Sequence, residues 1–170
     1  FIDGQKFEIK NPGEAMASGI RVIYQELNTL NNLTVAENIF IGEQLVKTRL
    51  KIVDWKSMVR KSKMILDSLN VSLNPKAVME DLSVSEKQVV EIAKALSKEA
   101  KILVMDEPTA ALSEDDTRSL FRIISTLKEK GVSIIYISHR LKEIFEITDR
   151  VTVLRDGKKV KTLVTSETNT

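Results

Sequence analysis

The amino-acid sequence predicts an α/β fold in which helices cover a core sheet of parallel strands. Ile102–Met105 and Ile134–Ile137 are short apolar runs, a pattern typical of strands buried inside a parallel sheet. Segments with helical periodicity and capping residues lie before and between these two runs, as expected when helices connect parallel strands. We expect Ile102–Met105 to form a central strand that is covered on both faces.

The first 26 residues are expected to contribute strands and one short helix. The turn pair Asp3-Gly4 favours a β-hairpin, and the breaker sequence Asn11-Pro12-Gly13 should end it. In order, the expected elements are a hairpin over residues 1–9, a helix near residues 14–18 and a strand over residues 19–25.

A helical insert is expected over roughly residues 27–79. Thr34 and Glu37 have the spacing of a capping box, which predicts a helix through about Ile41. Asp54 should cap a longer helix. Four apolar residues have the spacing of one face of that helix: Trp55, Val59, Leu66 and Leu69.

Two further helices and a hairpin complete the predicted layout. Ser83 and Glu86 form a second capping box at the start of a helix. The buried stripe of that helix is expected to comprise Val89, Val90, Ile92, Ala93 and Leu96. Ser113 should cap the next helix, and the alternating residues 151–164 predict a terminal hairpin.

The composition is that of one soluble globular domain. At 170 residues, the chain is long enough to bury a substantial core. Its 26 basic and 24 acidic residues nearly balance, so the charge gives no support for nucleic-acid binding. The absence of cysteine excludes disulfides and thiolate chemistry, and no apolar run is long enough to span a bilayer. Any association with a membrane is therefore expected to involve a partner protein.

Polar residues follow the predicted strands at what should be one edge of the sheet. Gln25 ends the first strand, Asp106 and Glu107 follow the second, and His139 follows the third. Ligands of open α/β sheets bind at the carboxyl ends of the strands. One of the two adjacent carboxylates could hold a magnesium ion through water while the other reaches a different point in the crevice.

In this order, these residues and the capped helix resemble the nucleotide-binding domain of ATP-binding-cassette (ABC) transporters. The matching motifs are the Q-loop at Gln25, the signature loop at Leu82–Gln88, the Walker B strand at Ile102–Glu107, the D-loop at Pro108–Ser113 and the switch histidine at His139. The resemblance covers nearly the whole chain. It implies a P-loop NTPase-type core sheet with a helical subdomain and a partial antiparallel β subdomain.

The same resemblance divides a single domain over residues 1–170 into three parts. The expected parts are a β subdomain remnant with the Q-loop strand at 1–26, a helical subdomain with the signature helix at 27–100, and the Walker B and switch-histidine core at 101–170.

A phosphate-binding loop of the form G-x-x-x-x-G-K-[S/T], the Walker A motif, does not occur in this sequence. No two of its six glycines fit that spacing. In the family this loop lies upstream of the Q-loop, so we expect it before Phe1. The chain is therefore expected to be an N-terminally truncated fragment that is inactive alone. A protein that never had the loop is the alternative.

Several stretches resemble the ATPases of monosaccharide importers, and in particular the first of their two tandem domains. These stretches are Tyr24–Asn28, Leu33–Gly42, Val53–Lys56, Val90–Leu96 and Ile137–Phe145. Ribose, galactose and xylose importers are the nearest kinds, although importers of nucleosides and signalling molecules leave the cargo open. Chromosome-maintenance and DNA-repair ATPases insert long coiled coils, for which the 57 residues from Gln25 to Leu82 leave no room.

The resemblance implies an ATPase subunit that energises import of a simple sugar, with ATP and Mg²⁺ as cofactors. Its expected partners are a second ABC ATPase domain packed head to tail, the membrane permease and, indirectly, a sugar-binding protein, with no nucleic acid. The expected location is cytoplasmic, on the inner face of the cell membrane. Two alternatives are a regulatory module that binds nucleotide without turnover and a soluble ABC ATPase of translation or repair.

The resemblance also implies roles for single residues. Glu107 is the expected general base that orients the attacking water, and Asp106 is expected to hold magnesium. His139 is expected to contact the γ-phosphate, and Gln25 to contact the metal or the water. The structural alternatives are a histidine that merely ends a strand and a glutamine on the surface.

The N-terminus of the signature helix is expected to face ATP held by the second domain, because helix N-termini present free N–H groups and partial positive charge. The expected contacts are Ser83, Val84, Ser85, Glu86 and Gln88. Val84 and Ser85 replace the family's usual two glycines, and Glu86 replaces its glutamine. Ser113 replaces the D-loop aspartate. We therefore expect slow hydrolysis at the site that this loop completes.

Overall fold

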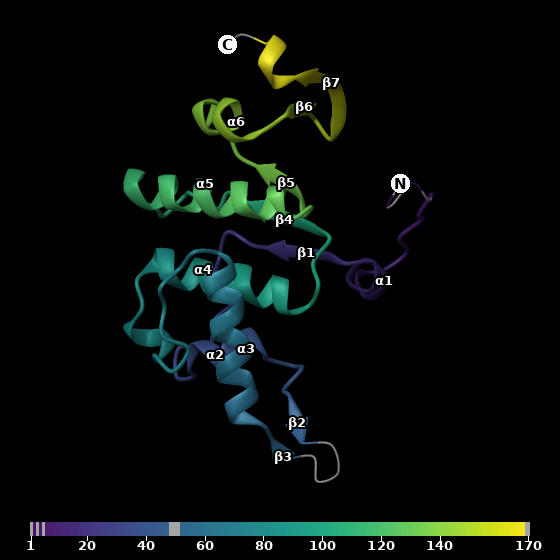
Figure 1. Cartoon of the computed structure of the whole chain (residues 1–170). Helices are drawn as coiled ribbons and strands as arrows, with labels where there is room; N and C mark the ends of the chain where they lie inside the picture. Colours follow the sequence, from purple (N-terminus) through teal and green to yellow (C-terminus); the bar gives the residue numbers. More distant parts are fainter. Residues whose placement is uncertain (1, 3, 5, 48–51, 169–170) are drawn as a thin grey trace.

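The computed structural model describes residues 2, 4, 6–47 and 52–168 of the chain (Figure 1). The helices in these ranges are α1 (Pro12–Ala17), α2 (Val35–Ile39), α3 (Trp55–Ser68), α4 (Val84–Ser97), α5 (Glu114–Glu129) and α6 (Leu141–Ile147). The strands are β1 (Ile20–Ile23), β2 (Val46–Lys47), β3 (Ile52–Val53), β4 (Ile102–Asp106), β5 (Ser133–Ile137), β6 (Arg150–Arg155) and β7 (Lys158–Val164). Short 3₁₀ helices cover Met79–Asp81 and Thr165–Glu167. None of the helices within the described ranges has the length and apolar character needed to cross a membrane.

The core sheet has the strand order β1-β4-β5, and all three strands are parallel. Asp106 at the end of β4 lies opposite Ile137 at the end of β5. The carboxyl ends of the strands therefore meet at one edge, where the loops containing Gln25, Glu107 and His139 begin. The predicted parallel sheet, with Ile102–Met105 in its centre, is confirmed.

Among the described residues, helices pack on one face of this sheet. Leu103 and Met105 of β4 are fully buried on the covered face, together with apolar side chains of α4 and α5. On the opposite face, Val22, Ile135 and Ile137 are 42%, 52% and 45% exposed. The prediction that the central strand is covered on both faces is therefore wrong for the described residues, because α4 and α5 pack their apolar side chains on the Leu103 face.

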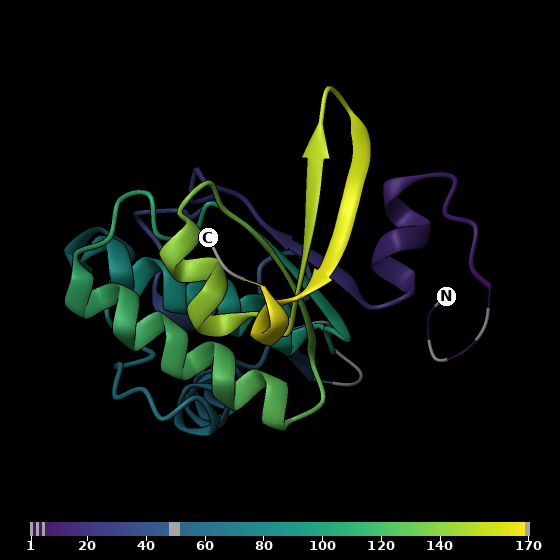
Figure 2. The same cartoon turned by 90° about the horizontal axis from the view of Figure 1, so that it is seen from above.

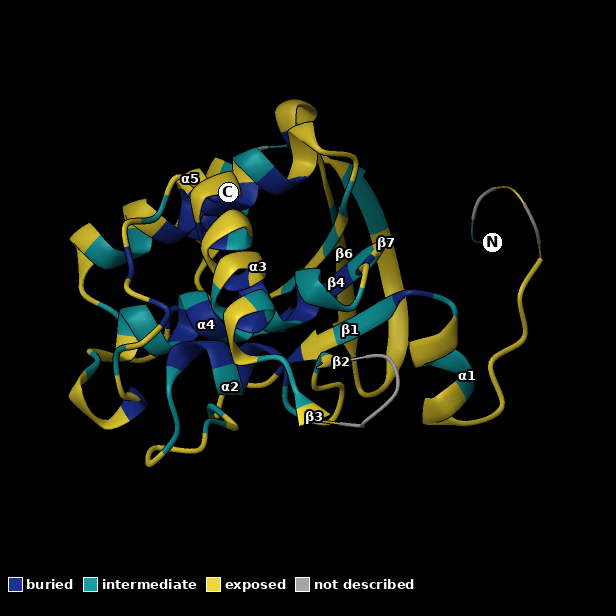
Figure 3. Cartoon of the chain, turned by 60° about the horizontal axis from the view of Figure 1, so that its bottom comes forward, coloured by how far each residue is buried: buried dark blue, intermediate teal, exposed yellow. Residues whose placement is uncertain are grey.

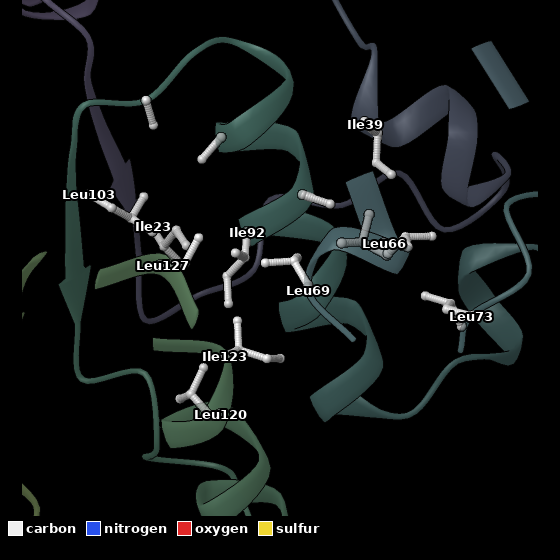
Figure 4. Packing of buried hydrophobic residues seen from close by; sticks show 14 of the residues in the cluster. Ile23, Ile39, Leu66, Leu69, Leu73, Ile92, Leu103, Leu120, Ile123 and Leu127 are labelled. Carbon is white, nitrogen blue, oxygen red and sulfur yellow. The ribbon is translucent and has the colours of Figure 1, made fainter. Parts of the chain in front are cut away.

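One continuous cluster of buried apolar side chains joins the helices to the sheet (Figure 4). Ile39 of α2, Leu66 of α3 and Ile92 of α4 belong to it. Leu103 of β4 and Leu127 of α5 belong to the same cluster. Figure 3 shows buried residues in α2, α4 and β4, whereas β7 is largely exposed. The helical segment and the parallel sheet therefore share one core.

The predicted helix starts are confirmed. The backbone N–H of Thr34 donates to Glu37 at 2.9 Å, and Glu37 N donates back to Thr34 Oγ1 at 3.3 Å. The same pair of hydrogen bonds caps α4, and Ser113 caps α5. The predicted terminal hairpin forms from the antiparallel pair β6 and β7, which projects beyond the helices in Figure 2.

The hairpin predicted over residues 1–9 is seen only in part: Ile2 lies in an isolated β-bridge and Gly4, with φ +77°, lies in a turn, but no strand follows over residues 6–9. Residues 6–10 have no regular secondary structure. Residues 1, 3 and 5 lie outside the described part of the chain. A two-stranded hairpin is marginal unless other elements pack against it. A hairpin that the sequence did not predict, β2 with β3, occurs instead within the helical insert.

Helix α3 buries part of the predicted face: Leu66 and Leu69 are buried as predicted, Val59 is partly buried, and Trp55 is not buried. Met58, Ser62 and Leu66, which are spaced four residues apart, are buried, whereas Trp55 is 54% exposed. Residues four apart share one face of a helix, and this face packs toward α2 and α4. The prediction used only the spacing of apolar residues, whereas the position of the neighbouring helices decides which side chains are buried.

The buried and exposed faces of α3 predict different effects of substitution on stability. Met58→Ala should lower the free energy of unfolding by about 2–5 kcal/mol, because it opens a cavity in a fully packed core. Met64→Ala in the same helix should change it by less than about 0.5 kcal/mol, because that side chain is exposed. Chemical denaturation followed by circular dichroism measures both. Equal effects of the two substitutions would contradict the assigned face of α3.

Candidate functional site

Glu107 and His139 form a close pair at the carboxyl edge of the sheet. Glu107 Oε1 lies 2.8 Å from His139 Nδ1, although the two residues are 32 positions apart. The backbone N–H of Glu107 donates to the carbonyl of Ile137 at 2.9 Å, which joins the ends of β4 and β5. The structure therefore brings together the two residues that the sequence predicted to be catalytic.

The backbone of Glu107 has an unusual conformation. Its φ is +45°, in the left-handed region that non-glycine residues rarely occupy. Such residues cost free energy and cluster at functional sites, where the surrounding structure holds them. Here the turn directs the carboxylate toward His139, whose side chain is 72% exposed, while that of Glu107 is only 28% exposed.

Asp106 has the chemistry of a ligand for a hard cation. It ends β4 and is partly buried, and its carboxylate has no hydrogen bond or ion pair to any other described residue. A carboxylate without a protein partner at a strand end suits magnesium, which binds through one or two carboxylates and several waters. Among the described residues, no three His, Cys, Asp or Glu side chains cluster as a complete protein cage.

Gln25 lies two residues beyond the end of β1 and is exposed. No hydrogen bond joins it to Asp106 or to any other residue in the described ranges. The described contacts therefore do not connect these two residues, which were predicted to share a metal. The role of Gln25 stays a prediction.

The capping box at the start of α4 determines where Glu86 points. Ser83 N donates to Glu86 Oε2 at 2.9 Å, and Glu86 N donates to Ser83 Oγ at 3.3 Å. The glutamate thus folds back onto the helix N-terminus. Val84 is 48% exposed, and Ser85 Oγ lies 3.1 Å from Ser83 Oγ. The capping interaction occupies the N–H groups of Ser83 and Glu86.

Gln88 was predicted to contact nucleotide, but its side chain is engaged within the chain. It is 5% exposed, and Nε2 donates to the carbonyl of Pro108 at 2.7 Å. This hydrogen bond joins the N-terminal part of α4 to the loop after β4. The signature helix and the D-loop are thereby connected directly.

Two residues near the site, Asp116 and Tyr136, have shifted pKa values. Hydrogen bonds from Ser113 and then Ser85 hold the pKa of Asp116 below its ordinary value, which places the start of α5 beside the signature loop. Burial, and then the hydrogen bond to Glu143, raise the pKa of Tyr136 well above its usual range. Tyr136 therefore stays a protonated hydrogen-bond donor near neutral pH.

Sequence reasoning missed a buried polar cluster beside this site. Glu143 of α6 is 7% exposed and accepts hydrogen bonds from Thr109, Tyr136 and Ser138. No spacing pattern in the sequence singles out these residues, because they come from three separate segments. The one available hint was a glutamate close after His139 in an otherwise mostly apolar helix.

Comparison with known proteins gives consistent matches. A family profile described as "ABC transporter" matches residues 1–110. The ribose import ATP-binding protein RbsA of Clostridium perfringens (strain SM101 / Type A) is 48% identical over 158 residues, which are 93% of this chain and 32% of that protein. The galactose/methyl galactoside import ATP-binding protein MglA of Treponema denticola is 46% identical over 165 residues, or 97% of this chain and 33% of that protein. The chain thus spans about a third of the length of the curated relatives that it matches.

A solved structure supports the same relationship. The crystal structure of an ATP-binding cassette of an ABC transporter, in its ADP conformation, matches with a TM-score of 0.76 and 27% sequence identity. The match covers 91% of this chain and 64% of that chain. The similarity therefore extends over nearly all of the sheet and helices described above.

Proposed function

Because this chain belongs to the ABC transporter family, we propose that it is part of an ATPase subunit that powers the import of a simple sugar. The observation that carries the proposal is the Glu107–His139 pair, 2.8 Å apart at the carboxyl edge of the parallel sheet. The names of the relatives, which are ribose and galactose import ATP-binding proteins, support a monosaccharide as cargo.

In the proposed reaction, Glu107 orients the water that attacks the γ-phosphate of ATP and accepts its proton. Oε1 of Glu107 is hydrogen-bonded to His139, which leaves Oε2 for the water. The largely exposed imidazole of His139 keeps Nε2 available for a second contact, and when both ring nitrogens are protonated it can donate to the γ-phosphate. The pair therefore contacts both reactants.

Asp106 is the residue that would hold magnesium, with Gln25 as a further candidate ligand. Bound magnesium neutralises developing charge on the phosphate oxygens. Asp106 suits the role because its carboxylate has no partner among the described residues. Walker A contacts to the phosphates would come from a segment outside this sequence, which contains no such motif.

We further propose that the N-terminus of α4 faces ATP held by a second ATPase domain, packed head to tail and in tandem on the intact protein. Ser83, Val84 and Ser85 form this end of a 14-residue helix. The intact subunit would act on the inner face of the cell membrane by binding permease subunits, which in turn receive sugar from a binding protein.

The experiment that tests this function uses the full-length protein assembled with its permease in proteoliposomes. Mg-ATP should drive uptake of ribose, galactose or xylose when the matching sugar-binding protein is present. Uptake that requires no ATP, or hydrolysis that no permease stimulates, would contradict the proposal. The second outcome would favour a soluble ABC ATPase.

A second candidate is a regulatory module that binds nucleotide with little turnover. The side chains at Val84 and Ser85 favour it, because they stand where the family has glycines that allow close approach of the backbone to phosphate. ATP binding by the assembled complex without hydrolysis would support this candidate over the importer.

The serine in the signature loop predicts an effect of substitution on ATP turnover. Ser85→Gly in the assembled full-length protein should raise the ATP turnover of the composite site, because removing the side chain lets the backbone N–H approach the γ-phosphate. Steady-state phosphate release measures the effect. The control, Ser57→Gly, makes the same change in the first turn of α3 and should leave turnover unchanged.

A turnover that stays flat or falls in Ser85→Gly would mean that the serine hydroxyl is itself a productive phosphate ligand. The carboxylate of Glu86 is folded back onto Ser83, and the substitution leaves it in place. The substitution therefore tests the side chain of Ser85 alone.

A further inference from the structure

We propose that Glu143 is a positioning residue that holds the Glu107–His139 pair in its reactive geometry. The proposal rests on the proposed function, because it gives Glu143 a part in ATP hydrolysis. Glu143 lies in α6, and no described hydrogen bond joins it to either member of the pair. It binds instead the two chain segments that carry them.

The first segment is the start of the D-loop. Thr109 Oγ1 lies 2.8 Å from both carboxylate oxygens of Glu143 and donates to them. Thr109 is only 1% exposed and stands two residues after Glu107. On the other side, Gln88 donates to the carbonyl of Pro108. The turn that contains Glu107 is therefore held both from α6 and from α4.

The second segment surrounds His139. Tyr136 Oη and Ser138 Oγ donate to Glu143 Oε2 at 2.7 Å and 3.2 Å. Arg140, directly after the histidine, places Nη1 3.3 Å from Glu143 Oε1. Residues on both sides of His139 thus bind the same carboxylate that holds the D-loop.

A carboxylate, with two acceptor oxygens and no donor, suits this set of donors. A buried charge is costly unless it is fully hydrogen-bonded, and here three hydroxyls and one guanidinium supply donors to two oxygens. Glutamine would keep the shape but offer one acceptor oxygen and an NH₂ donor. At least one of the hydroxyls would then have to turn away.

The geometry of the pair depends on both segments at once. Glu107 follows β4 and His139 follows β5, so a shift of one loop relative to the other changes the 2.8 Å contact directly. A misplacement of about 1 Å can reduce catalysis by about 100-fold. Glu143 is therefore expected to affect the chemical step more than the binding of ATP.

The test compares variants of the full-length protein assembled with its permease. Glu143→Gln should lower kcat for Mg-ATP hydrolysis by about 10-fold to 100-fold while KM changes less than about twofold. Glu143→Leu should lower kcat further, so that glutamine gives partial rescue. The matched control is Glu146→Gln in the same helix, where the side chain is exposed and wild-type kcat and KM are expected.

Thr109→Val tests the same network if the Glu143 variants do not fold. It removes one hydroxyl donor with little change of shape and should lower kcat by about 3-fold to 10-fold. Because Thr109 acts through Glu143, the double variant Thr109→Val with Glu143→Gln should be no slower than Glu143→Gln alone.

Three results would overturn the positioning role. Two concern Glu143→Gln: a wild-type kcat, or a lowered melting temperature without a lowered kcat. The third is an additive loss of kcat in the double variant. If Glu143 variants do not fold, wild-type kcat in Thr109→Val overturns it. A wild-type protein that does not hydrolyse Mg-ATP would contradict the proposed function, and this inference with it. A hydrolysing wild type with an unaffected Glu143→Gln contradicts the inference alone.

Discussion

Glu107→Gln in the full-length protein is expected to lower steady-state ATP hydrolysis by at least about 100-fold while ATP binding is retained, since general base catalysis contributes about 10²–10⁴-fold. The amide keeps the shape of the side chain but cannot accept a proton from water. It can still accept a hydrogen bond from His139, which lies 2.8 Å from Glu107 Oε1. Phosphate release measures turnover, and equilibrium binding of labelled ATP measures affinity.

Glu99→Gln is a matched control for this prediction. Glu99 is also a glutamate with positive φ, at +53°, but it follows α4 and is exposed away from the site. The control therefore reproduces the chemical change and the backbone conformation without the pairing to histidine. Unchanged turnover in Glu107→Gln would remove Glu107 from the role of base and direct attention to His139.

The second large effect concerns the 170-residue chain as a separate polypeptide, which should show little or no ATP hydrolysis and only weak affinity for nucleotide. A Walker A loop cradles the β- and γ-phosphates with backbone N–H groups and a lysine, and this sequence contains no such loop. One face of the sheet, which includes Ile135 and Ile137, is also exposed, because no helix among the described residues packs on it. Isothermal calorimetry and phosphate release measure the two quantities.

The full-length protein under identical conditions is the comparison for this experiment. A dissociation constant for ATP below about 1 mM, together with magnesium-dependent turnover by the 170-residue chain, would contradict the prediction. It would mean that the strand edge and the signature helix bind phosphate without a Walker A loop.

Local patterns in the sequence determined most of the secondary structure. The apolar runs that became β4 and β5, and the capping pairs Thr34–Glu37 and Ser83–Glu86, involve residues at most four positions apart. Their periodicity and hydrogen-bonding chemistry do not depend on the rest of the molecule. The motifs at the strand ends and at the capped helix carried the resemblance to the family, and that resemblance implied the roles of Glu107 and His139.

Tertiary structure alone decided what these residues contact. Sequence spacing could not predict that His139 lies 2.8 Å from Glu107. Nor could it predict that Gln88 is buried and donates to the carbonyl of Pro108. It also placed the exposed Trp55 on the buried face of α3 and did not predict the carboxylate of Glu143, which binds residues from two distant loops. The physical reason is the same in each case. Packing between elements selects which face of a helix is buried and which polar groups lose water, and those groups must then find partners that are remote in the chain.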